Sequence, residues 1–218
     1  MKNRFDDEKY LVIHMDDIGM GYAANMAAKR LFEKGIVTSA SVMVPCPWAH
    51  DFIRWYRDNP HYDVGIHFTH TCEWDACRWR PLSSVTETPG LYDDSGFMWR
   101  GFKEEIKSVP PEQVRLEMKR QLEQAYSWGM KPTHLDSHMW IATQTPEFFE
   151  IYLETAKECS LIPHIPEWAR KNELMLEMAD KAQFPVIDKG LSFGEAPDLR
   201  TKREIMYTTL ESAQPGLN

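Results

Sequence analysis

Acidic and histidine side chains recur near the ends of apolar runs in this sequence. The residues placed in this way are Asp16, Asp17, His67, Asp136 and His138. One carboxylate and two imidazoles that face one cavity can bind a divalent metal and still leave coordination positions for water and substrate. Water bound to such a metal becomes acidic, and a nearby carboxylate can accept its proton. This combination of groups is typical of sites that hydrolyse amides and esters.

The adjacent carboxylates of Asp16 and Asp17 allow two roles at one place. Adjacent side chains point in different directions, so one carboxylate can bind the metal while the other faces the attacking water. The residues alone leave open which carboxylate does which. Each motif also has a purely structural interpretation, because an Asp-Asp pair often forms a turn or a helix cap. Their joint placement at three strand ends is what favours a shared site.

The elements that must position these residues are short apolar runs alternating with amphipathic stretches. Strands are predicted over 10–15, 36–44, 63–68 and 133–136, with a weaker one over 184–188. Helices are predicted over 22–34, 49–58, 110–128, 146–158, 172–182 and 202–213. The segment 69–108 shows no clear period and is predicted to be a long functional loop.

This alternation predicts parallel strands with right-handed crossovers, as in a doubly wound sheet or a β/α barrel. In both architectures the functional residues gather at the carboxyl ends of the strands. That rule is the reason why the aspartates and histidines above are expected to meet.

Composition excludes several classes of function. The 218 residues carry 25 Lys plus Arg against 33 Asp plus Glu, a formal net charge of −8, and no basic block that would wrap a nucleic acid. Apolar runs are too short to span a bilayer, and the first ten residues lack the apolar region of a secretion signal. We therefore expect one cytoplasmic domain over 1–218 with neither a nucleic-acid nor a membrane partner.

Three segments together resemble a known family. They are LVIHMDDIGMGYAANMAAKRLFEKGIVTSASVMVPCPWA, VGIHFTHTCEW and PTHLDSHMW, in that order. They resemble the YdjC-like (ChbG/HpnK-type) carbohydrate deacetylases, and the resemblance covers about residues 10 to 160. It implies a distorted, mostly parallel (β/α) barrel, one divalent metal ion, and removal of N-acetyl groups from amino-sugar oligosaccharides or glycoconjugates.

The resemblance also implies residue roles. Asp17, His67 and His138 match the metal ligands of the family, and Asp16 matches its proposed general base. Asn25 falls on a recurrent position after the Asp-Asp turn, where we expect it to position that turn or cap its helix. Zinc and magnesium are the first candidates for the metal, and nickel, cobalt and manganese are also compatible with these ligands.

Substrate contacts are expected from aromatic and polar side chains around these motifs. In the loop after His67, Glu73, Trp74 and Arg78 suit stacking on sugar rings and hydrogen bonding to hydroxyls. Trp140 stands where many family members have a second histidine of a His-x-His motif, and it could form part of the sugar subsite or pack in the core.

The end of the sequence departs from the family pattern. Members usually continue past a Pro-Gly segment into a strand ending His-Pro, whose histidine resembles a general acid, whereas this sequence ends at Asn218. His70 and His164 are the two histidines that could substitute. A barrel lacking that strand would have a gap or an exposed edge, which favours homo-oligomers.

Two other functions stay open from the sequence. One is a non-catalytic sugar-binding remnant, which the absent His-Pro strand favours. The other is a different metal-dependent barrel hydrolase. An amidohydrolase normally carries His-x-His at its first strand end, where this sequence has His14, Met15 and Asp16.

Overall fold

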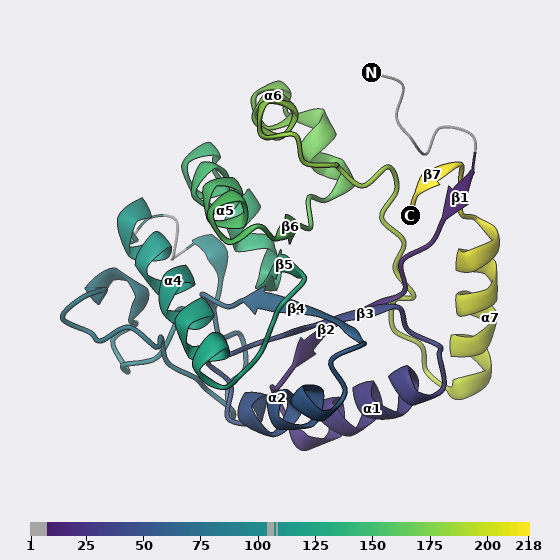
Figure 1. The fold of residues 1–218 in the computed structure, drawn as a ribbon, viewed down its shortest axis with the longest axis horizontal. Helices are drawn as coiled ribbons and strands as arrows, with labels where there is room; N and C mark the ends of the chain where they lie inside the picture. The colour runs from purple at the N-terminus through teal and green to yellow at the C-terminus, as the bar shows by residue number, and fades with distance from the viewer. Residues whose placement is uncertain (1–7, 104–106, 108) are drawn as a thin grey trace.

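A parallel sheet of five strands, in the order β2-β3-β4-β5-β6, forms the centre of the molecule (Figure 1). The structure, a computed structural model, describes residues 8–103, 107 and 109–218. The strands are β2 (His14–Ile18), β3 (Ser39–Val42), β4 (Asp63–Phe68), β5 (His134–Ser137) and β6 (Ile162–Pro163). Because successive strands are parallel neighbours, the chain returns between them on the outside of the sheet. The predicted α/β architecture, a distorted barrel with mostly parallel strands, is confirmed.

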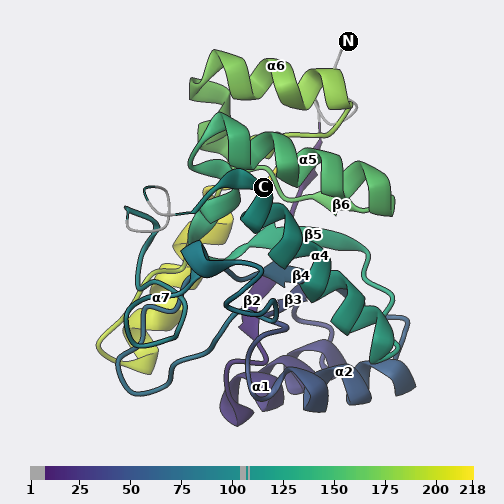
Figure 2. The ribbon, with the colours of Figure 1, turned by 90° about the vertical axis from the view of Figure 1, so that its left-hand side faces the viewer.

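Helices surround the strands. They are α1 (Tyr22–Glu33), α2 (Ala49–Asp58), α4 (Pro111–Ser127), α5 (Pro146–Cys159), α6 (Glu173–Ala182) and α7 (Leu199–Glu211). Short 3-10 helices span η1 (Pro89–Leu91), η2 (His138–Thr143) and η3 (Glu167–Lys171). In Figure 2, α4, α5 and α6 follow one another along one side of the molecule. Within the described ranges, none of the helices has the length and apolar character needed to cross a membrane.

The β4 strand serves both the core and the site. Val64, Ile66 and Phe68 are completely buried in the main hydrophobic cluster. Because successive side chains of a strand point to opposite faces, His67 lies on the other face, at the carboxyl end. Burying each large apolar side chain contributes roughly 1.5–3 kcal/mol, so the core holds the strand that carries the histidine.

The two edges of the large sheet do not pair with each other in the described part of the chain. The β2 edge and the β6 edge instead meet through side chains, since the rings of His14 and His164 lie edge to face at 6.0 Å. A separate parallel pair joins β1 (Lys9–Tyr10) to β7 (Gly216–Leu217), which brings two distant parts of the chain side by side.

The long segment after β4 is largely irregular, as predicted; the exceptions among its described residues are η1, two isolated bridges and helical backbone at 102, 103 and 107. Residues 104–106 and 108, near the end of the predicted loop, lie outside the described residues. The buried carboxylate of Glu117, on α4, anchors this segment: it accepts hydrogen bonds from the backbone N–H groups of Leu82 and Ser83 and from the Ser83 hydroxyl. The segment is therefore tied to the barrel wall.

Two parts of the sequence-based assignment were wrong. Residues 184–188 do not form a strand, because the guanidinium of Arg170 binds the carbonyls of Val186 and Ile187, and the Ile187 N–H donates to Ile165. The first strand also begins later than predicted, so Asp16 and Asp17 lie inside β2 rather than in a turn after it.

Candidate metal centre

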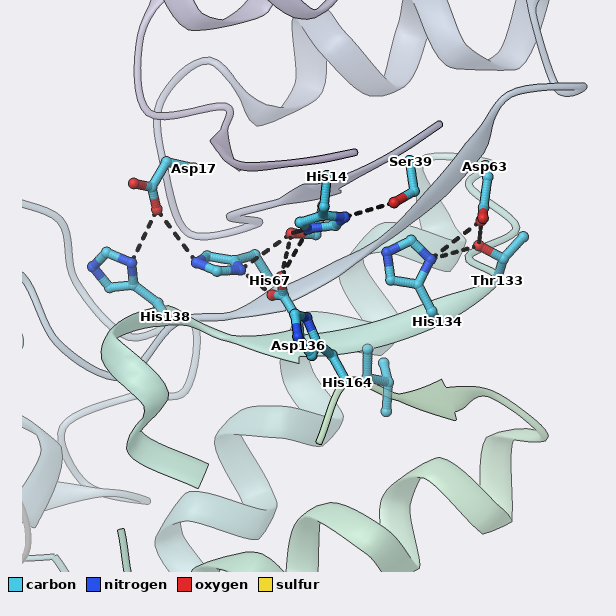
Figure 3. A network of polar contacts seen from close by, with 12 residues as sticks. His14, Asp17, Ser39, Asp63, His67, Thr133, His134, Asp136, His138 and His164 are labelled. Carbon is cyan, nitrogen blue, oxygen red and sulfur yellow. Dashed lines mark hydrogen bonds and ion pairs between the residues drawn. The ribbon is translucent and has the colours of Figure 1, made fainter. Parts of the chain in front are cut away.

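The side chains of Asp17, His67 and His138 converge at one point (Figure 3). One donor atom from each residue lies within 4.8 Å of the other two. Asp17 Oδ1 is 3.3 Å from His67 Nε2 and 3.0 Å from His138 Nδ1. A carboxylate with two imidazoles is a donor set that divalent metals accept, and bond lengths near 2 Å suit donors at this spacing. These residues therefore fit a divalent metal ion.

A break in the β2 ladder positions Asp17. The pairing of β2 with β3 shifts register between Met15 and Ile18, and Asp17 has a left-handed backbone with φ 59°. Such a bulge re-aims a side chain at the rim of a barrel. Asp16 and Asp17 thereby leave the regular alternation of the strand.

The Asn25 side chain holds the turn after Asp17 in place. The buried Asn25 side chain accepts a hydrogen bond from the Gly19 N–H at 2.9 Å and donates one to the Trp48 carbonyl at 2.9 Å. Gly19 has φ 95°, and a Cβ there would lie 2.9 Å from Ala49 Cα, so only glycine fits. The position of the aspartate thus depends on α1 and the start of α2.

The two histidines come from neighbouring strands. His67 is the next-to-last residue of β4, and His138 begins η2 directly after β5, whose Asp136 is the register partner of His67. Met139 and Trp140 then both take left-handed backbone conformations, with φ 53° and 58°. Two such residues in succession are costly for non-glycine side chains and are typically kept at functional sites.

Each histidine ring also contacts a second carboxylate. The Nδ1 atom of His67 contacts Asp136, and the Nε2 atom of His138 donates to Glu73 at 2.9 Å. The contacts leave His67 Nε2 and His138 Nδ1 facing Asp17. Both rings are therefore fixed in orientation by acidic partners.

The electrostatics of the cluster follow from burial and close charge. Burial disfavours the protonated form of His67, but the negative charges of Asp136 and Asp17 prevail and raise its pKa to about 10. Burial would raise the pKa of Asp17, whereas hydrogen bonds from His138 and His67 outweigh it and hold that pKa well below its usual range. The carboxylates around the two rings therefore favour positive charge at this point of the structure.

A pocket of about 260 Å³ opens on the triad. Its walls are formed by His14, Asp16, Asp17, His67, Glu73, Asp136, Ser137, His138, Met139, Trp140 and His164. The exposed carboxylate of Asp16 and the three convergent residues therefore share one cavity.

The residues expected to contact substrate divide into two groups. Glu73 and Trp140 line the pocket, although the carboxylate of Glu73 is already bound to His138. Among the described residues, the pocket walls include neither Trp74, which is 51% exposed, nor Arg78. The Arg78 guanidinium is bound inside the loop by Asp93 at 2.7 Å and by the carbonyl of Met98.

The two histidines that could act as the general acid, His70 and His164, also differ in position. His164 lines the pocket, whereas His70 is fully buried and is not one of the residues described as lining it. Neither ring nitrogen of His70 has a hydrogen-bond partner within the described residues. Burial lowers the pKa of each imidazole to about 4, so both are neutral near pH 7.

His14 and Ser41 also belong to the site, although neither was expected there from the sequence. His14 Nε2 lies 3.0 Å from Asp136, and the Ser41 hydroxyl donates to the same carboxylate at 2.9 Å. The two-residue spacing of His14 from Asp16 could have signalled that both face the barrel interior. Ser41 carried no comparable signal, because a serine in an apolar strand is common.

Comparison with known proteins agrees with this geometry. A family model described as YdjC-like protein matches residues 10–214. The chain belongs to the YdjC-like family. The resemblance found in the three motifs is therefore confirmed, and the match extends beyond residue 160 to residue 214, just past α7.

Curated relatives of this YdjC-like chain are named carbohydrate deacetylase. The protein from Thermoanaerobacter pseudethanolicus is 30% identical over 208 residues, which cover 95% of this chain and 78% of that protein. The one from Thermus thermophilus is 36% identical over 73% of this chain and 54% of its own length. The one from Geobacillus stearothermophilus is 33% identical over 70% of this chain and 58% of its own length. The chain thus spans little more than half of the latter two proteins.

A solved structure supports the YdjC-like fold. It is a crystal structure from Enterococcus faecalis V583, described as a candidate cellobiose-phosphate cleavage protein. It matches with a TM-score of 0.78 at 22% identity, over 96% of this chain and 78% of that one. At this level of identity the likeness concerns the fold alone.

Proposed function

We propose that this YdjC-like chain is a metal-dependent carbohydrate deacetylase that removes N-acetyl groups from an amino-sugar oligosaccharide or glycoconjugate. The observation that carries the proposal is the convergence of Asp17, His67 and His138 on a pocket that also contains Asp16. The names of the relatives support the same activity. The match to the YdjC-like family model covers the segments that carry all of these residues.

In this mechanism Asp17, His67 and His138 hold the cation and Asp16 handles the proton. A divalent ion supplies Lewis acidity toward the acetyl carbonyl and lowers the pKa of water. The carboxylate of Asp16 lines the pocket beside the triad and accepts a proton from the attacking water. The two adjacent aspartates then have separate tasks, and the bulge in β2 is what allows both to face the cavity.

Among the possible metals, we propose zinc as the first candidate. Two imidazoles favour a transition metal over magnesium, which prefers oxygen ligands. Nickel, cobalt, manganese and magnesium belong in the same assay because the donor set accepts each of them. The metal that restores most activity to the chelator-treated protein identifies the preferred ion.

The sugar is proposed to stack on Trp140. Its indole lines the pocket and is 37% exposed, while His164 and Trp168 meet it edge to face at 5.1 and 6.4 Å. An exposed, braced aromatic face suits the apolar face of a pyranose ring.

The decisive experiment measures acetate release from N-acetylated chitooligosaccharides. Protein treated with EDTA is compared with protein reloaded with each metal, and His67→Ala serves as the variant without the central ligand. Release that depends on metal and is lost in His67→Ala supports the proposal. Binding of the sugars without any acetate release would instead favour the sugar-binding alternative, and release from ester or phosphate substrates alone would favour another hydrolase.

A further inference from the structure

Both histidines at the candidate metal centre have their outward ring nitrogen bound to a carboxylate. His67 contacts Asp136 through Nδ1, and His138 contacts Glu73 through Nε2. The opposite nitrogen of each ring faces Asp17. A hydrogen bond at one ring nitrogen places the proton there and leaves the lone pair on the other nitrogen. The contacts therefore select the tautomer of each ring that a cation requires.

The environment of Asp136 sets it apart from Glu73. The Asp136 side chain is 5% exposed, whereas that of Glu73 is 32% exposed. Asp136 also receives a hydrogen bond from the Ser41 hydroxyl at 2.9 Å and lies 3.0 Å from His14 Nε2. His14 is held in turn by Ser39, 2.7 Å from its Nδ1 atom (Figure 3). A buried carboxylate with several donors has a single orientation available to it.

We propose that Asp136 is the positioning residue for the metal ligand His67, and that His14 and Ser41 hold Asp136 in the required orientation. Asp136 is not itself a ligand in this proposal. It acts through the His67 imidazole, because its carboxylate contacts Nδ1 while Nε2 faces Asp17 and the cation site. The inference rests on the metal centre of the proposed function, but it concerns metal affinity rather than the identity of the substrate.

The test compares metal affinity across three variants of the full chain. Asp136→Ala removes the carboxylate, and Asp136→Asn keeps an amide oxygen that can still accept the Nδ1 proton. Asp63→Asn is the matched control, because Asp63 contacts the Nδ1 atom of His134 at 3.2 Å in the same sheet, away from the triad. Zinc affinity is measured by calorimetry with a competing chelator, and cobalt-loaded protein gives an absorption spectrum that reports ligand geometry.

We expect Asp136→Ala to bind zinc about 10- to 100-fold more weakly and Asp136→Asn to recover part of that loss. Asp63→Asn is expected to keep the parent affinity and cobalt spectrum. An affinity of Asp136→Ala within about twofold of the parent overturns the inference. So does an equal loss in Asp63→Asn, because the effect would then follow from general damage to the sheet.

Folding and activity are followed separately. If Asp136→Ala does not fold, Asp136→Asn decides the question. A neutral amide oxygen is a weaker acceptor than a carboxylate, so the inference requires a partial loss of zinc affinity in this variant, and an unchanged zinc affinity and cobalt spectrum overturn it. In one outcome the parent protein binds zinc and yet releases no acetate. Weaker zinc binding by the Asp136 variants would then support the positioning role, while the proposed deacetylase activity would be refuted. If the parent protein releases acetate but its zinc affinity does not change in the Asp136 variants, the deacetylase proposal is supported and the positioning role is refuted.

Discussion

At the scale of single residues, neighbouring carboxylates on one strand have different surroundings. Asp17 contacts two histidines, and its pKa is held well below the usual range because their hydrogen bonds outweigh burial. Asp16 is exposed in the wall of the same pocket. This difference supports the proposed assignment of metal binding to Asp17 and proton transfer to Asp16.

Replacing Asp16 by Asn should separate metal binding from catalysis. We expect Asp16→Asn to keep its zinc affinity, because the ligands are intact, and to release acetate about 10²- to 10⁴-fold more slowly, since a general base is lost. Asp17→Asn, measured in parallel, should lose zinc affinity as well. Calorimetry and acetate assays on both proteins check the prediction, which fails if Asp16→Asn loses zinc to the same extent as Asp17→Asn.

Two exposed tryptophans near the site offer a matched pair. Trp140 lines the pocket, whereas Trp74 is more exposed and does not belong to the described pocket walls. Because stacking on an aromatic ring is worth roughly 0.5–1.5 kcal/mol, Trp140→Ala should raise KM for chitooligosaccharides about threefold to tenfold. Trp74→Ala should leave KM unchanged. Equal effects of the two substitutions would remove the assigned stacking face.

At the scale of elements, the site depends on how β2 ends. The bulge between Met15 and Ile18 turns Asp17 toward the histidines, and the Gly19 turn that follows is tied to α1 by Asn25. Asn25 also donates to Trp48 and to Asp51. One buried amide therefore connects the turn after Asp17 with two helices.

The Asn25→Ala protein should lose stability and metal affinity together. Removing a buried side chain that pairs the Gly19 N–H and the Trp48 carbonyl should cost about 1–3 kcal/mol in the free energy of unfolding. The control is Asn59→Ala, whose amide donates to Trp55 at the far end of α2. Urea unfolding and zinc titration of both variants test the link. Normal zinc affinity in a destabilised Asn25→Ala protein would show that the turn does not position Asp17.

At the scale of the whole molecule, buried neutral histidines link folding to pH. His70 is fully buried, and burial lowers its pKa from 6.5 to about 4. His164 shows the same direction for the same cause, with a pKa lowered to about 4. Between these values the unfolded chain binds more protons than the folded one, so stability falls as the pH falls from 6.5 toward 4.

We expect metal-free protein to lose stability on acidification in that window. For His70 the difference between pKa 6.5 and about 4 corresponds to a loss of up to about 3 kcal/mol in the free energy of unfolding. The His70→Leu variant should show a shallower dependence. Urea unfolding of EDTA-treated protein at several pH values between 7 and 4 measures both. A parent whose stability stays constant from pH 6.5 to 5 would contradict the buried neutral state.

Metal binding should stabilise the whole fold. A ligand that binds only the folded protein stabilises it by about 2.7 kcal/mol at a concentration 100 times its Kd. We therefore expect zinc to raise Tm of the EDTA-treated protein, and His138→Ala to abolish the increase because a ligand on η2 is lost. Thermal unfolding with and without zinc checks this. An equal increase in His138→Ala would place the cation elsewhere.

The sequence by itself determined the parallel α/β architecture and the group of aspartates and histidines at the strand ends. The resemblance to the YdjC-like family then selected Asp17, His67 and His138 from that group. Apolar periodicity and the rule that parallel strands end at one edge are local and topological signals, and both can be read along the chain. The helices at 49–58 and 146–159 and the strand at 63–68 were predicted within a residue for this reason.

Tertiary structure alone decided what those signals do not encode. The register shift between β2 and β3 that turns Asp17 depends on neighbours distant in sequence, and so does the contact of Asp136 with His67. The absence of a strand at 184–188 has the same origin, since the Arg170 guanidinium binds the carbonyls of Val186 and Ile187. Side-chain partners are chosen by packing in three dimensions, whereas periodicity reports only which face of an element is buried.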